Sequence, residues 1–308
     1  MRVTQTMLTK TNIGHLSSSY QKLSVLQEQL ISGKKIQRPS EDPVVAMQGI
    51  RYRTEVREVD QFKKNISEAT GWMDLTDSAL DEASSAMRRI RELTTQAAND
   101  TYDATQRQAI QSEVGQLIEH IGTLANTKYN EKSIFNGTKT DKPLVDMDAL
   151  KDYLKNGGAT SSIYKDATIA DQAIEYEISS GIKVDINVKP DEVFGTTTFE
   201  KLKALYDKLG ESVQNNGEEL SGMLESIDDI LDKTVETRAD LGARVNRLEL
   251  NASRLDDQEI IAKAIMSNNE DIDAEKVIME LKSYETLHRA ALSAGARVIQ
   301  PTLLDFLR

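Results

Sequence analysis

Apolar residues near both ends of the chain recur at alternating intervals of three and four positions. A period of 3.5 residues places a narrow apolar seam on one side of a helix, and such a seam packs against a partner helix rather than into a broad core. We therefore predict that the two ends pair as a coiled coil. The seam positions are Ile13, Leu16, Tyr20, Leu23 and Leu30 at the start, and Val277, Leu281, Tyr284, His288, Ala291, Gly295 and Val298 near the end.

The longest seam follows a helix start signal at Asp42 and Pro43. Aspartate is a favoured N-cap, and proline fits the first helical position because its missing N–H would have no partner there. Of twelve seam positions, ten are apolar and two are Thr, which predicts a long helix of coiled-coil character. They are Val59, Phe62, Ile66, Ala69, Met73, Thr76, Leu80, Ala83, Met87, Ile90, Thr94 and Ala97.

Further apolar periodicity predicts helices over residues 110–124 and 199–209. A long helix follows, because nine of eleven seam positions between residues 220 and 255 are apolar. Around Glu259–Ile261 the apolar stripe shifts its register, which predicts a joint before the terminal helix.

The middle of the chain, residues 138–199, has a different character. It contains Gly157-Gly158 and scattered Ser and Thr, and two strand-like runs at 173–178 and 182–188 flank Ser179-Ser180-Gly181. Two such runs around a short turn predict a β-hairpin.

Together these patterns predict a mainly α fold. We expect an elongated helical rod, a coiled-coil-like bundle of N- and C-terminal helices, with a small mixed α/β or β-hairpin insertion at its distal end. A chain that runs out and back places both termini at the same end. The predicted parts are the terminal helices, 1–40 with 263–308; a helical rod domain, 41–137 with 200–262; and a small outer domain with the hairpin, 138–199.

Charge and composition narrow the class of protein. Ala, Leu, Glu, Lys, Arg and Gln are abundant and only 5% of residues are aromatic, which favours helical bundles. Residues 1–40 hold six basic residues and one acid, a charge of +5, so the rest of the chain carries −17 to give the net −12. Nucleic-acid binding needs a clustered cationic face, so this acidic body argues against a nucleic-acid partner.

We expect no catalytic, cofactor or metal site. The chain has no Cys, which excludes disulfides and thiol nucleophiles, and its three His are far apart without ligand spacing. The acidic run 269–275 lacks the glycine and spacing of a calcium loop, so it is interpreted as a helix N-terminus. The sequence contains no run of 18 apolar residues, so it predicts no membrane span. The basic start is not followed by an apolar segment, so we expect no conventional secretory signal.

Five segments near the two ends resemble motifs of the bacterial flagellin family. They lie within residues 1–140 and 200–308 and follow the order of the family, whereas the middle of the chain matches only as a hairpin. The segments are LISGKKIQRPSEDPVVA at 30–46, LTTQAANDTYDATQRQAIQSEV at 93–114, KYNEKSIFNG at 128–137, RADLGARVNRLE at 238–249 and DIDAE at 271–275.

The resemblance implies a self-assembling structural protein of the flagellum, not an enzyme. Three features favour the branch of the family that forms the hook–filament junction: the run Pro39–Pro43 in place of an Ala-rich run with paired acids, the end LLDFL at 303–307, and a terminal helix that is not rich in Gln and Ala. The filament-forming branch remains an alternative. A second alternative is a cytoplasmic coiled-coil adaptor that shares only the periodicity with this family.

By this resemblance the terminal helices are expected to be disordered in the monomer and to pair on assembly. The implied partners are the preceding hook-associated protein, flagellin, further copies in a ring, a cytoplasmic export chaperone and the flagellar export apparatus, with no membrane or nucleic acid. The implied location is the extracellular flagellum, reached without a cleaved signal peptide.

Two groups of residues are candidates for function. Arg238 on the rod seam either packs its stem and extends its head into solvent, or forms a salt bridge across the rod or between subunits. The expected assembly-interface residues are Ile13, Leu16, Leu23, Leu30, Leu281, Leu303, Leu304, Phe306 and Leu307, and the expected rod-signature residues are Ser40, Asp42, Pro43, Arg238 and Asn246.

Overall fold

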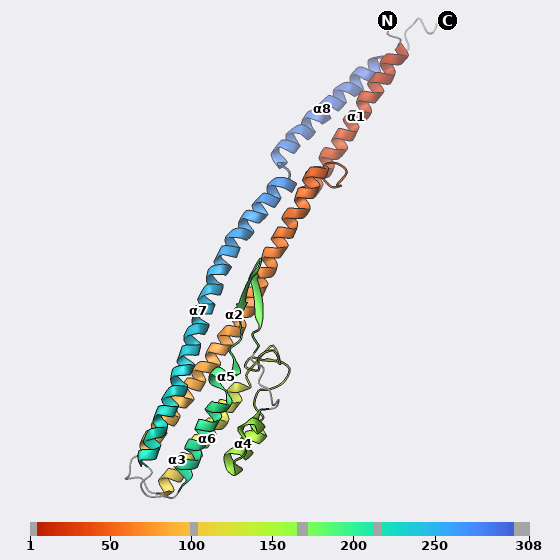
Figure 1. The fold of residues 1–308 in the computed structure, drawn as a ribbon. Coiled ribbons are helices and arrows are strands. Elements are labelled where there is room, and N and C mark those ends of the chain that lie inside the picture. Colours follow the sequence, from red (N-terminus) through yellow and green to blue (C-terminus); the bar gives the residue numbers. More distant parts are fainter. Residues whose placement is uncertain (1–4, 99–103, 165–171, 212–216, 299–308) are drawn as a thin grey trace, which may run out of the picture. The chain divides into compact units, whose positions relative to one another are not determined.

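The computed structural model describes residues 5–98, 104–164, 172–211 and 217–298 of the chain (Figure 1). Long helices dominate these residues, as the sequence predicts. The elements are α1 (Gln5–Ser32), α2 (Pro43–Ala97), α3 (Ala104–Ala125), β1 (Lys128–Tyr129), β2 (Lys132–Ser133), α4 (Met147–Asn156), the 3-10 helix η1 (Thr160–Ile163), β3 (Glu175–Ser179), β4 (Ile182–Asp185), α5 (Pro190–Val193), α6 (Thr196–Gly210), α7 (Gly217–Glu270) and α8 (Ala274–Val298).

The chain divides into two compact units. Unit 1 comprises residues 1–58 and 257–308, and unit 2 comprises residues 59–256. Both α2 and α7 contribute to each unit, because each helix continues across the division. The three-part division expected from the sequence, with ends that are disordered in the free monomer, stays a prediction.

Unit 1 is built around the antiparallel pair of α1 and α8, which lie side by side (Figure 1). The rings of Tyr20 and His288 lie 6.2 Å apart in this seam. At the other end of the pair, the turn after α1 is hydrogen-bonded to the turn between α7 and α8. There Lys35 N donates to Glu270 O at 2.7 Å, and Ile272 N donates to Gly33 O at 3.1 Å.

Unit 2 is a helical bundle with a continuous apolar core. Eleven of the twelve seam positions predicted in α2 are buried, and Phe62 is half-buried. The seam of α7 packs into the same core through Leu220, Leu241 and Leu248. Helices α3 and α6 lie side by side, and Gln111 Nε2 donates to the Tyr206 carbonyl at 2.9 Å between them.

The β-hairpin predicted in the middle of the chain is present. Strands β3 and β4 pair antiparallel, and Gly181 at their turn has a φ of +73°, in the left-handed region that glycine tolerates. The hairpin extends along α2, where Asn65 Nδ2 donates to the Glu177 carbonyl at 2.8 Å. Residues Leu150, Ile178 and Phe194 of the middle segment belong to the same hydrophobic cluster as the long helices.

The structure differs from the sequence-based expectation at the joint before the terminal helix and in several short elements. The register shift at Glu259–Ile261 does not interrupt the helix, since α7 continues to Glu270 and the break falls at Asp271–Asp273. Helix α4 was not predicted. It is short, its N-terminus is capped by the Asp146 carboxylate, and it ends at Asn156, directly before Gly157.

Candidate assembly surfaces

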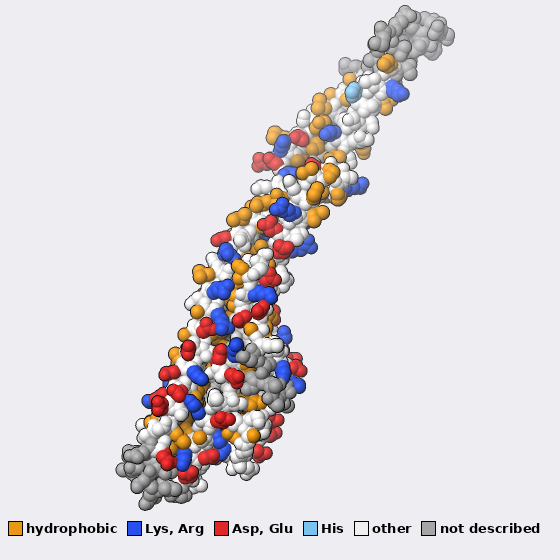
Figure 2. Space-filling model, viewed as in Figure 1, with side chains coloured by type: hydrophobic (Ala, Val, Ile, Leu, Met, Phe, Trp, Pro, Cys, Tyr) orange, Lys and Arg blue, Asp and Glu red, His pale blue; other side chains and the backbone are white. Residues whose placement is uncertain are grey.

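Exposed large hydrophobic side chains are concentrated in unit 1. Among the described residues, sixteen of the eighteen belong to unit 1, and only Val235 and Leu250 belong to unit 2. On the face drawn in Figure 2, charged side chains crowd the surface of unit 2, whereas hydrophobic ones recur over α1 and α8. Because large exposed apolar patches mark interaction sites, unit 1 is the candidate assembly region.

The predicted interface residues divide between the α1–α8 seam and the solvent. Leu16, Leu23 and Leu281 are half-buried. Ile13 is 56% exposed and Leu30 is 37% exposed, so both remain available to a partner. The other four predicted residues, Leu303, Leu304, Phe306 and Leu307, lie outside the described residues.

A second group of exposed apolar residues was not predicted from the sequence. It lies where α2 begins and where α7 ends, beyond the terminal helix pair. The signal was present in the sequence: the register shift near residue 260 moves the apolar stripe of α7 to its outer face. The residues are Val44, Met47 and Ile50 in α2, and Ile260, Ile261 and Ile265 in α7.

A charged cluster fixes the joint of unit 1. Arg53 Nε and Nη2 donate to the two carboxylate oxygens of Glu270 at 2.7 and 2.6 Å, and Lys34 Nζ lies 3.3 Å from Glu270 and 2.6 Å from Asp271. The hydrogen bonds from Arg53 hold the pKa of Glu270 below its ordinary value. Hydrogen bonds from Lys34 and Ser267 lower the pKa of Asp271 in the same way.

The signature residues Asp42 and Pro43 start helix α2, as predicted from the sequence. Helix α2 begins at Pro43, and Asp42 Oδ1 accepts hydrogen bonds from the amides of Val44 and Val45 at 3.0 and 3.2 Å. Ser40 is exposed in the turn before them. These contacts cap the helix and set the direction in which the chain enters it.

The same region contains a small pocket of about 120 Å³. The approach of α7 to α2 is close here, because a Cβ built on Gly49 would lie 2.6 Å from Glu270 Oε1. Apolar residues and two arginines surround the pocket. Its lining is Ile36, Gln37, Arg38, Pro39, Val45, Ala46, Gly49, Ile50, Arg53 and Glu270.

Arg238 forms a salt bridge across unit 2. Its Nε and Nη2 donate to Asp77 at 2.9 and 3.1 Å, and its Nη1 donates to Asp81 at 2.5 Å. Of the alternatives left open by the sequence, the structure shows the pair across the bundle, within one chain. Asn246, two turns later on α7, is exposed.

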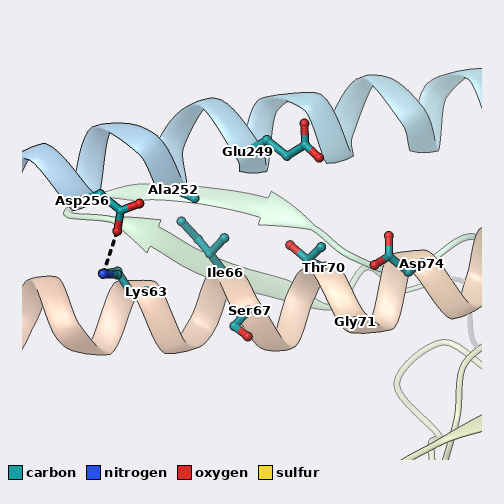
Figure 3. Close-up of a pocket in the computed structure, with 9 residues that line it drawn as sticks. All are labelled: Lys63, Ile66, Ser67, Thr70, Gly71, Asp74, Glu249, Ala252 and Asp256. Carbon is teal, nitrogen blue, oxygen red and sulfur yellow. Dashed lines mark ion pairs between the residues drawn. The ribbon is translucent and has the colours of Figure 1, made fainter.

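A larger groove, about 530 Å³ in volume, lies between α2 and α7 in unit 2 (Figure 3). Its apolar floor is formed by Ile66 and Ala252, and an ion pair between Lys63 and Asp256 spans one end at 2.7 Å. Gly71 lines the groove, and a Cβ at this position would lie 2.6 Å from the Tyr129 hydroxyl.

The histidines serve in packing or at the surface. His120 Nε2 lies 3.1 Å from a Glu82 carboxylate oxygen, His288 packs against Tyr20, and His15 is exposed. Within the described ranges, no group of three or more His, Cys, Asp or Glu is arranged to hold a metal ion. None of the described helices is both long and apolar enough to span a membrane. Only the last part of the acidic run 269–275 is the helix start that was predicted: α7 ends at Glu270, and Asp273 Oδ1 accepts from Lys276 N at 3.2 Å at the start of α8.

Known proteins similar to this chain come from the flagellum. Flagellin from Listeria monocytogenes is 25% identical over 311 residues, which cover 100% of this chain and 99% of the relative. Flagellar hook-associated protein 3 from Salmonella typhimurium is 25% identical over 307 residues, which cover 96% of this chain and 95% of the relative.

Solved structures share the fold. Flagellar hook-associated protein 3 from Legionella pneumophila matches with a TM-score of 0.61 and 16% identity, covering 70% of this chain and 97% of that chain. The FlgL protein of Bacillus cereus matches with a TM-score of 0.57 and 18% identity, covering 70% of this chain and 99% of that chain. The mainly helical fold with a two-stranded insertion is thereby confirmed.

Family models match both ends of the chain. The bacterial flagellin N-terminal helical region matches residues 3–140, and the C-terminal helical region matches residues 224–307. The two matches cover most of the sequence and coincide with the segments that resemble flagellin motifs. The chain therefore belongs to the bacterial flagellin family, whose members are structural proteins of the flagellum.

Proposed function

We propose that this protein forms the junction between the hook and the filament of a bacterial flagellum. The concentration of exposed apolar side chains in unit 1, which contains both termini, supports an assembly role. The run Pro39–Pro43 and the end LLDFL favour the junction over the filament. The relatives named hook-associated protein 3 are consistent with this role.

Assembly orders the ends of the chain against neighbouring subunits. Fixing the backbone of one residue costs about 1–2 kcal/mol, so long terminal segments need partner surfaces to remain ordered. A preformed ring of the preceding hook-associated protein supplies such surfaces from below, and this ring in turn presents a template to flagellin above. A cytoplasmic chaperone covers the apolar ends before export, and the protein leaves through the flagellar export apparatus without a cleaved signal peptide.

The filament subunit itself is the second candidate. One observation supports it: the flagellin of Listeria monocytogenes and the hook-associated protein 3 of Salmonella typhimurium are equally similar to this chain, at 25% identity. Sequence identity therefore does not separate the two functions, and a genetic test is needed.

Deletion of the gene distinguishes the candidates. For a junction protein we expect hooks without filaments and flagellin released as monomer into the culture medium. Loss of the flagellin antigen itself would identify the chain as the filament subunit. Unchanged flagella would contradict both roles.

Limited proteolysis of the purified monomer tests the coupling of order to assembly. We expect trimming to a stable core of about residues 40–262, because ends that no partner supports are accessible to the protease. Full resistance of α1 and α8 in the monomer would favour a coiled-coil adaptor with permanently ordered termini. Purified flagella treated with the same protease serve as the matched sample, in which the ends should be protected.

A further inference from the structure

We propose that copies of this chain associate head to tail through two different faces of unit 1, which bind each other by shape and charge. The first face is the small pocket between the turn 36–39 and the start of α2. The second face is the outer side of α7 around Ile261. This inference rests on the proposed assembly of several copies and names the surfaces that they use.

The two faces point away from each other on the same unit. Glu270 of α7 faces α2, because it is bonded to Arg53 and contacts Gly49. Ile261 precedes Glu270 by nine residues, which turns its side chain about 180° around the helix. Ile261 is 58% exposed and Ile265 is 40% exposed, so neither is covered by the part of the chain that the structure describes.

The size of the pocket suits one apolar side chain. Its volume is about 120 Å³, and a cavity of about 150 Å³ holds one benzene molecule. Ile36, Pro39 and Ile50 supply apolar walls. A branched aliphatic side chain such as that of Ile261 fits this space, and its burial would remove two exposed apolar surfaces from water at once.

Charge complements the apolar contact. Asp257 lies one turn before Ile261 and therefore on the same side of α7. It is exposed, and it has no ion-pair partner among the residues that the structure describes. Arg38 on the wall of the pocket is exposed and equally unpaired there. A second copy that inserts its Ile261 also brings its Asp257 to the basic edge of the pocket.

A contact between two different faces cannot satisfy itself in a closed dimer. Each copy that uses its α7 face leaves its own pocket free for the next copy. Such heterologous contacts produce a ring when the rotation closes and a helical array when it does not. The geometry therefore matches an assembly of several identical subunits around one axis.

Cross-linking tests the contact directly, because the chain has no native Cys. Flagella are purified from cells that carry the double variant Ile50→Cys/Ile261→Cys and treated with a short bifunctional maleimide. We expect a ladder of dimers, trimers and larger species on a denaturing gel. Each single variant, Ile50→Cys or Ile261→Cys, should yield monomers, because a head-to-tail contact never brings two identical positions together.

The outcomes separate this inference from the proposed function. Absence of the unsubstituted chain from purified flagella would overturn the proposed function and this inference with it. Presence of the double variant in flagella without a ladder would overturn the inference alone. Dimers from a single variant would also overturn it, because they indicate an isologous contact.

Charge reversal gives a second test that does not depend on cysteine chemistry. We expect Asp257→Arg or Arg38→Asp alone to lower the amount incorporated into flagella on the order of tenfold, and the two reversals together to restore it. Glu236→Arg, an exposed site on α7 in unit 2, is the matched control and should incorporate normally. Far-UV circular dichroism confirms folding of each variant. Failure of the double reversal to restore incorporation would overturn the pairing of Asp257 with Arg38.

Discussion

Arg53 and Glu270 are joined by two parallel hydrogen bonds of 2.7 and 2.6 Å, although 217 residues separate them in the sequence. The Glu270 side chain is only 6% exposed. A guanidinium that binds both oxygens of a carboxylate fixes orientation as well as distance. The start of α2 and the end of α7 are therefore held in one arrangement within unit 1.

Removal of the Glu270 charge should loosen this joint. Glu270→Gln keeps the size of the side chain but weakens its hydrogen bonds to Arg53 and Lys34, and we expect a loss of about 2 kcal/mol in the stability of unit 1. Hydrogen exchange of peptides covering residues 34–53 in assembled subunits, whose ends are expected to be ordered, measures this local loss. The exposed site Glu236→Gln is the matched control. Equal protection in both variants would contradict the assignment.

Unit 1 should lose stability on acidification. Hydrogen bonds from Arg53, and then from Lys34, lower the pKa of Glu270 from its ordinary value of 4.5, while burial opposes them. A carboxyl group whose pKa is lowered in the folded state stabilises that state above its ordinary pKa, and the contribution disappears as the pH falls through the lowered value. Exchange rates in residues 34–53 of assembled subunits, measured as the pH is lowered from 6, show the effect. The dependence should be flatter in Glu270→Gln.

Gly49→Ala should destabilise the protein, contrary to the usual effect of this substitution in a helix. The new Cβ would lie 2.6 Å from Glu270 Oε1 and would displace the carboxylate from Arg53. Gly222→Ala in α7 is the control, because nothing lies within 4 Å of its Cβ position. There we expect a gain of about 0.5–1 kcal/mol from helix propensity. Urea unfolding, monitored by circular dichroism, shows whether each substitution raises or lowers the free energy of unfolding.

Arg238 should couple energetically to Asp77. Its guanidinium binds both oxygens of Asp77, and its side chain is 27% exposed. For a partly exposed pair we expect a coupling of about 1 kcal/mol. A double-mutant cycle with Arg238→Ala and Asp77→Ala measures this coupling. Unfolding of each variant is monitored by the fluorescence of Trp72, the one tryptophan of the chain, which is buried in α2. Additive losses would show that the pair contributes nothing to unit 2.

Exposed apolar residues of unit 1 should matter for assembly but not for folding. Ile13→Glu places a charge at a site that is 56% exposed in α1, and Leu250→Glu does so at a site that is 74% exposed in unit 2. Both monomers should unfold like the parent chain, within about 0.5 kcal/mol. Only Ile13→Glu should reduce incorporation, scored by immunoblots of purified flagella. Equal incorporation of both variants would remove Ile13 from the interface.

Periodicity predicted the long helices well because their cores repeat one simple contact. A seam of alternating three- and four-residue steps identifies the buried face without knowledge of the partner, as in the stretch from Val59 to Ala97. The same rule failed near Glu259–Ile261. A change of stripe indicates which face becomes apolar, but it does not indicate whether the helix ends there, and this helix continues to Glu270.

The specific ion pairs of the joint in unit 1 and of the bundle in unit 2 could not be predicted from the sequence. Glu270 meets Arg53 and Lys34 only because α7 returns beside α2, and many acids could have matched either base. Arg238 likewise reaches Asp77 across 161 positions of sequence. Short elements such as α4 bury only three residues, Leu150, Tyr153 and Leu154, which is too few for a periodic pattern to stand out.

The pairing of α1 with α8 also sets the order of events when the chain is made. A contact such as Lys34 with Asp271 closes a loop of 237 residues, so the first helix has no partner until almost the whole polypeptide has been synthesised. Unit 2 is complete earlier, because its residues are consecutive and end at residue 256. The unit that we propose to meet other subunits is thus the last to be completed, and a chain truncated before α8 cannot form it.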